Sequence, residues 1–147
     1  MAGDSRTATH DDVNVMIKLY ELRREPRMRE ARQWFAASFK VRTLDEFHVV
    51  CPIGSEQNAS YRMIVTYWDM VASFVVAGAL NQHLFFQSGG EMLFVWERIR
   101  DIVPNLRQAY VNPTLYRNLE QVASAFIVWW NEQAPGAYEA FSKRIRG

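Results

Sequence analysis

The segment from residue 56 to 80 constrains the fold of this chain more than any other feature. Its apolar residues are spread around most of the helical circumference: Tyr61, Met63, Ile64, Val65, Tyr67, Trp68, Met70, Val71, Phe74, Val75 and Val76. A helix with one wet side carries its apolar residues on a single stripe. The pattern therefore predicts a long central helix over about residues 56–80, covered by neighbouring helices on several sides.

Four polar residues interrupt this apolar surface at spacings of 4, 3 and 4: Arg62, Thr66, Asp69 and Ser73. That spacing places them on one narrow stripe of the helix. The stripe either lines a pocket or is the one strip of the helix that reaches water. We favour the second interpretation, because solvated stripes are the commoner case.

Helix start signals mark the chain on both sides of this segment. Thr9 and Asp12 form an N-terminal capping pair, and Pro26 either kinks the first helix or starts a second one. Residues 88–91 have the pattern of a further capping box. Pro104 bends or ends the helix that follows, and Asn112 with the proline after it predicts the next helix start.

No segment alternates with a period of two for long enough to predict a strand. The fold class is therefore all-α: a compact bundle of about six to seven helices around the helix at 56–80. Residues 1–8 are predicted to be a disordered tail, and residues 9–147 a single helical domain.

Charge and cysteine content exclude several classes of partner. The 17 basic and 16 acidic residues leave a net charge of +1, which gives no field for attracting nucleic acid. Five arginines between residues 23 and 32 alternate with glutamates, which favours a salt-bridged solvent face. The single cysteine, Cys51, suits a reducing compartment, and the longest apolar run is too short to span a membrane. A cytoplasmic location follows as the expectation.

Aromatic residues occur in four adjacent pairs: Trp34-Phe35, Tyr67-Trp68, Phe85-Phe86 and Trp129-Trp130. Neighbours on a helix point about 100° apart, so both rings cannot enter one seam. Core packing explains some of these rings. A ring left over indicates self-association, a protein partner or a ligand.

Three short motifs lie within residues 60–103: Tyr67-Trp68-Asp69, Gly78-Ala79-Leu80-Asn81 and Trp96-Glu97. This region resembles a family of small, helical bacterial proteins of unknown function, although Asn81 stands where an acidic residue is expected. The resemblance implies the helical fold and a structural importance of Asp69 and Glu97. It implies no activity.

Catalytic chemistry has little support in the sequence. Asp69 and Glu97 would have to approach each other to act as an acid–base or metal-binding pair. A buried Asp69 paired with Arg62 or Arg98 is the favoured interpretation, because a charge in an apolar helix needs a partner. The histidines show no metal-ligand spacing, so we expect neither a metal nor a cofactor.

Three function classes remain open. A helical interaction or oligomerisation module is favoured, with a homodimer as one form of it. The alternatives are a binder of a small apolar or aromatic ligand within the bundle and, with least support, an enzyme that uses Asp69 or Glu97. The candidate ligand- or partner-binding residues are Arg62, Thr66, Trp68, Asp69, Ser73, Trp96, Glu97 and Trp130.

Overall fold

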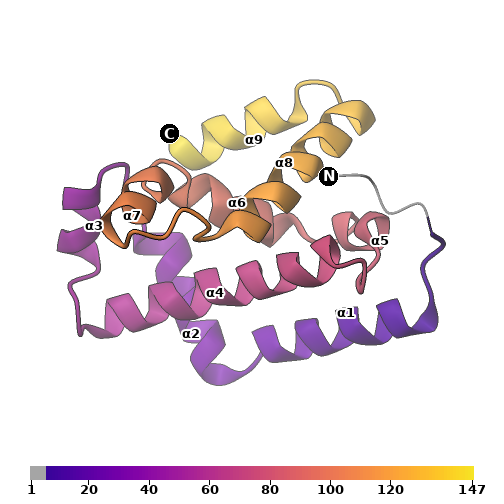
Figure 1. Ribbon diagram of the computed structural model, residues 1–147, viewed down its shortest axis with the longest axis horizontal. Coiled ribbons are helices and arrows are strands. Elements are labelled where there is room, and N and C mark those ends of the chain that lie inside the picture. Colours follow the sequence, from indigo (N-terminus) through magenta and orange to yellow (C-terminus); the bar gives the residue numbers. More distant parts are fainter. Residues whose placement is uncertain (1–5) are drawn as a thin grey trace.

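The computed structural model describes residues 6–147, and this part of the chain folds into nine helices without a strand (Figure 1). The all-α prediction is confirmed. The helix count is above the predicted six to seven, because short helices form where the sequence was expected to give turns or to continue longer helices. Residues 1–5, which make up most of the predicted tail, lie outside the described part.

The nine helices follow one another in this order: α1 (His10–Arg23), α2 (Pro26–Ser38), α3 (Leu44–Val50), α4 (Glu56–Val76), α5 (Gln82–Phe86), α6 (Gly90–Ile99), α7 (Val103–Ala109), α8 (Arg117–Gln133) and α9 (Ala137–Arg146).

Helix α4 is the central element, as predicted, and it packs against α8, α2 and α6 (Figure 1). It begins after Ser55, whose hydroxyl accepts the backbone N–H of Asn58 at 3.0 Å. It ends four residues before the predicted position 80, because Gly78 adopts a left-handed φ of 76°. The N–H groups of Ala79 and Leu80 then bond back to the carbonyl of Phe74, which closes the last turn.

The predicted long helix after residue 90 is two helices, separated by a turn at residues 100–102. Pro104 causes the break, because its ring would clash with the carbonyl of Arg100 in a continuous helix. Pro104 is therefore the second residue of α7, where its missing N–H is harmless.

Helix α8 starts four residues after the predicted Asn112–Pro113 signal. The Asn112 side chain accepts the N–H of Thr114 at 3.2 Å and forms a turn instead of a helix cap. Tyr116 takes the N-cap position in a left-handed conformation, with a φ of 58° and no capping bond from its own side chain. The start of α8 therefore needs a cap from elsewhere in the fold.

Candidate functional site

An apolar cavity of about 400 Å³ lies between α1, α4 and α5. In Figure 1, α1 runs alongside α4 with the short α5 beyond one end of α4. The apolar side chains that line the cavity include Val13, Met16 and Ile17 of α1, Trp68 of α4, and Leu84 and Phe85 of α5.

The cavity has a closed floor and an open rim. Trp68 and Phe85 at the floor are 3% and 1% exposed, whereas Ile17 and Tyr20 at the rim are 52% and 53% exposed. Leu19 is the one buried apolar residue of α1, and the partly buried Val15 and Met16 pack against the core. The apolar side of α1 therefore borders both the core and the open cavity.

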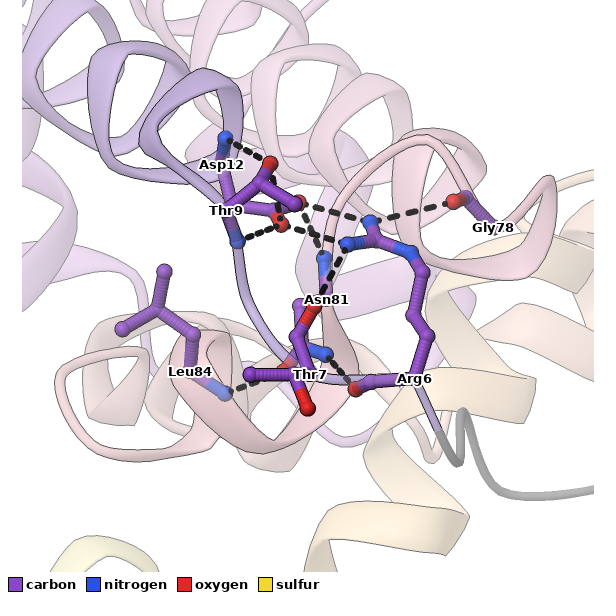
Figure 2. A network of polar contacts seen from close by, with 7 residues as sticks. All are labelled: Arg6, Thr7, Thr9, Asp12, Gly78, Asn81 and Leu84. Carbon is purple, nitrogen blue, oxygen red and sulfur yellow. Dashed lines mark hydrogen bonds and ion pairs between the residues drawn. The ribbon is translucent and has the colours of Figure 1, made fainter.

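The N-terminal end of α1 is held by a polar network around Asp12, which is 1% exposed (Figure 2). Both terminal nitrogens of Arg6 donate to the Asp12 carboxylate, at 2.5 and 2.7 Å. The backbone N–H groups of Thr9 and Asn81 add bonds of 2.8 and 2.9 Å. The Arg6 guanidinium and these N–H donors hold the pKa of Asp12 far below its usual range. The predicted Thr9–Asp12 cap is thus confirmed and also anchors α1 to another part of the fold.

We call the network around Asp12 the N-terminal clamp. Asn81 completes it from the segment between α4 and α5. Its amide nitrogen donates to the carbonyl of Arg6 at 2.7 Å, and its Oδ1 accepts the N–H of Leu84 at 2.9 Å (Figure 2). Arg6 also donates to the carbonyl of Gly78 at 3.3 Å. An ionised aspartate at position 81 would lack the donor, which explains in physical terms why an amide suits this position.

The C-terminal end of α1 is held by a second set of contacts, centred on Glu91. Arg23 of α1 donates to Glu91 at 2.7 Å, and Arg32 of α2 donates to it at 2.8 and 3.0 Å. The Tyr67 hydroxyl also donates to the carbonyl of Leu19 at 2.7 Å, and burial raises the pKa of Tyr67 to about 12. We call this set the C-terminal clamp.

The C-terminal clamp corrects two sequence predictions. Glu91 does not form the predicted capping box at residues 88–91, because α6 has no side-chain cap and both Glu91 oxygens accept from arginines. The arginine run at 23–32 was interpreted as a solvent face, but Arg23 and Arg32 reach across to α6.

Trp68 has a buried donor without a partner in the described part of the chain. Its indole Nε1 is buried and has no hydrogen-bond partner among the described residues. The guanidinium of Arg23 lies over the Trp68 ring at 5.4 Å from the centroid, within the range of a cation–π contact. A buried indole N–H normally has an acceptor, so this group is an exception that calls for an explanation.

The polar stripe of α4 does not line this cavity. Arg62 and Thr66 are exposed, and Ser73 is half-buried. The Arg62 side chain donates to Asn58 at 3.0 Å, while the Thr66 and Ser73 hydroxyls donate to backbone carbonyls of their own helix. Of the candidate residues, Trp68 alone lines the cavity.

Asp69 is half-buried and caps α8. Its Oδ1 accepts the backbone N–H of Leu119 at 3.1 Å, which supplies the cap that Tyr116 does not provide. Desolvation raises the pKa of Asp69 against the opposing effect of this bond. The predicted pairing with an arginine is wrong: Arg62 binds Asn58, and Arg98 donates to main-chain carbonyls of α2 and the residue after it.

Glu97 is fully buried and serves the packing of α9. Its carboxylate accepts from Tyr138 at 2.7 Å, Ser142 at 2.6 Å and Arg100 at 3.1 Å. Glu97 and Asp69 share no hydrogen-bond partner in the described part of the chain, because Asp69 faces the start of α8 and Glu97 faces α9. The structure does not bring the two carboxylates together as a pair.

The other aromatic candidates pack inside the fold. Trp96 is 8% exposed, and Trp130 is half-buried between Phe126 and Phe141 at centroid distances of 6.5 and 5.3 Å. Each of the four adjacent aromatic pairs has at least one ring contact within the described chain. These residues do not gather at one surface site.

No helix in residues 6–147 is long and apolar enough to cross a membrane. Over the same residues, no cluster of three or more His, Cys, Asp or Glu side chains is placed to hold a metal ion.

Fold and cavity together define an all-helical protein in which one helix is clamped at both ends over an apolar space. The chain belongs to the DUF4760 family, a domain of unknown function, whose family model matches residues 8–126. Both clamps lie in the matched region except for Arg6, and α9 lies beyond it. The comparisons with curated proteins and with solved structures found no match.

Proposed function

We propose that this protein binds a small, mainly apolar ligand in the cavity between α1, α4 and α5. The observation that carries the proposal is the closed floor of Trp68 and Phe85 beneath a rim of exposed apolar residues. A volume of about 400 Å³ lies within the usual range of small-molecule sites, which are mostly apolar with a few polar groups.

The clamps support the same proposal, because they hold α1 at its two ends without filling the space beneath it. A preformed site of this kind loses little free energy to ordering on binding.

The proposal is tested by titrating the protein with octan-1-ol, a neutral probe with an eight-carbon tail, in a calorimeter. We expect saturable binding that the variant Met16→Trp abolishes, because the larger ring fills the cavity. Asn14→Trp is the matched control, since Asn14 is an exposed α1 residue outside the lining. Equal binding to both variants, or no binding to the unsubstituted protein, contradicts the proposal.

Association with another protein or with a second copy is the second candidate, and it is the function that the sequence favoured. The observation that supports it is the turn after α7, where Val111 is 87% exposed with a φ of 52°. A β-branched residue is strained in that conformation, and Tyr110 beside it is 59% exposed. Light scattering tests a homodimer: a mass that stays monomeric at high concentration contradicts self-association.

Three further expectations from the sequence stay proposals. A cytoplasmic location is supported by the lone, buried Cys51, whose thiol pKa burial raises to about 11. A bacterial origin rests on the sequence resemblance. An enzymatic use of Asp69 or Glu97 has the least support, because each carboxylate is engaged in a different packing contact.

A further inference from the structure

One end of the cavity carries a positive charge. Among the described side chains that line the cavity, Arg23 is the only charged one. Its guanidinium lies near the rings of Tyr20 and Trp68, at 5.6 and 5.4 Å from their centroids. The charge is therefore placed where the apolar lining meets the C-terminal clamp.

The C-terminal clamp does not neutralise this charge. Two guanidinium groups, those of Arg23 and Arg32, share the single carboxylate of Glu91, so the cluster keeps one surplus positive charge. Arg32 uses three nitrogens, two on Glu91 and one on the carbonyl of Arg23. Arg23 uses one terminal nitrogen, at 2.7 Å from Glu91, and within residues 6–147 its other N–H donors have no hydrogen-bond partner and can bind an acceptor.

We propose that the ligand is an apolar monocarboxylate whose tail lies on Trp68 and Phe85 and whose carboxylate binds Arg23. This inference rests on the proposed function and adds the chemical class of the ligand. A guanidinium fits a carboxylate through two parallel hydrogen bonds, and one negative charge matches the surplus of the cluster. The apolar lining strengthens that attraction, because it keeps water away from the charges.

The experiment compares two probes with tails of eight carbons, octanoate and octan-1-ol, by calorimetric titration at neutral pH. We expect octanoate to bind about tenfold more tightly than octan-1-ol, since hydrogen bonds to charged groups exceed neutral ones by about that factor. Arg23→Gln is expected to remove this preference, so that the variant binds octanoate and octan-1-ol with affinities within about twofold of each other.

Two further variants separate ligand binding from the role of Arg23 in the clamp. Glu91→Gln breaks the same ion pair but raises the surplus charge, so octanoate affinity should rise where Arg23→Gln lowers it. Arg29→Gln is the matched control, because Arg29 lies exposed on α2 and outside the cavity lining. If Arg23→Gln does not fold, the preference of the unsubstituted protein and its change in Glu91→Gln decide the question.

The outcomes distinguish the two proposals. If octan-1-ol binds as tightly as octanoate, and Glu91→Gln changes neither affinity, the carboxylate inference is overturned while the proposed function stands. If neither probe binds, both are overturned. A fall in octanoate affinity in Glu91→Gln equal to that in Arg23→Gln assigns both residues to the clamp and overturns the inference.

Discussion

Helix α4 is covered in two different ways on two of its sides. Toward α8 the contact is continuous: Leu119 and Val122 of α8 are fully buried, and Asp69 of α4 caps the start of that helix. Toward α1 the contact is interrupted, because polar clamps hold the two ends of α1 and the cavity lies between them. We call these the closed side and the open side of α4.

The difference teaches how a helix is fixed without filling the space beneath it. On the closed side, apolar burial both positions α8 and stabilises it. On the open side, directional hydrogen bonds and ion pairs position α1, so apolar side chains such as Ile17 stay available. Cavities in a core are normally costly, and one bordered by exposed apolar residues and kept open by polar anchors is typical of a binding site.

The largest expected difference between the sides is in the cost of shortening an apolar side chain. Leu119→Ala on the closed side should lower the free energy of unfolding by about 2–5 kcal/mol, because it leaves a cavity in a filled core. Ile17→Ala on the open side should change it by less than about 0.5 kcal/mol, since Ile17 is largely exposed. Urea denaturation measures both values, and equal losses would contradict the distinction between the sides.

A smaller loss in the free energy of unfolding is expected from removing the cap that joins α4 to α8. Asp69→Ala should cost about 1 kcal/mol, the usual value of a helix N-cap. Asp69→Asn should cost less, because its amide oxygen still accepts the N–H of Leu119. Thermal unfolding of both variants provides the measurement. A loss in Asp69→Asn as large as in Asp69→Ala would mean that the charge matters and that the cap does not.

The smallest effect on global unfolding is expected from the N-terminal clamp, because its loss frees α1 locally. The pKa of Asp12 is lowered in the folded state, so its stabilisation is present above the ordinary value of 3.8 and is lost as the pH falls below it. Asp12→Asn should therefore speed amide hydrogen exchange in α1 at neutral pH, with α8 unchanged.

The same variant has a built-in control in its pH dependence. As the pH falls from neutrality to well below 3.8, the thermal midpoints of Asp12→Asn and of the unsubstituted protein should draw together, because the carboxylate becomes protonated. A constant difference across that range would show that Asp12 acts through its shape alone.

Local sequence patterns predicted much of the fold. The apolar circumference of residues 56–80 identified the central helix, and Gly78 explains why it ends at Val76. Pro104 ends a helix, which was one of its two predicted outcomes. The error lies at Asn112, which forms a turn instead of a helix cap. Capping patterns identify residues that favour the start of a helix, but tertiary contacts decide at which of them a helix begins.

The candidate site was predicted in part. Trp68 was selected for its place in the apolar helix, but Asp12, Arg23 and Glu91 were missed as members of a site. Arg23 and Glu91 lie 68 residues apart, and the ion pair between them leaves no mark on local spacing. The excess of arginine over glutamate at residues 23–32 was the sequence signal for this site. The alternation of arginines with glutamates in that run favoured a solvent-exposed face instead.

The indole N–H resonance of Trp68 tests ligand binding on the open side most directly. The chain has five tryptophans, and the Trp68→Phe variant assigns the resonance by its absence from the spectrum. On titration with octan-1-ol we expect the Trp68 signal to shift saturably while that of the buried Trp96, outside the cavity lining, stays in place. An unmoved Trp68 signal at the solubility limit of the probe would contradict a ligand site beneath α1.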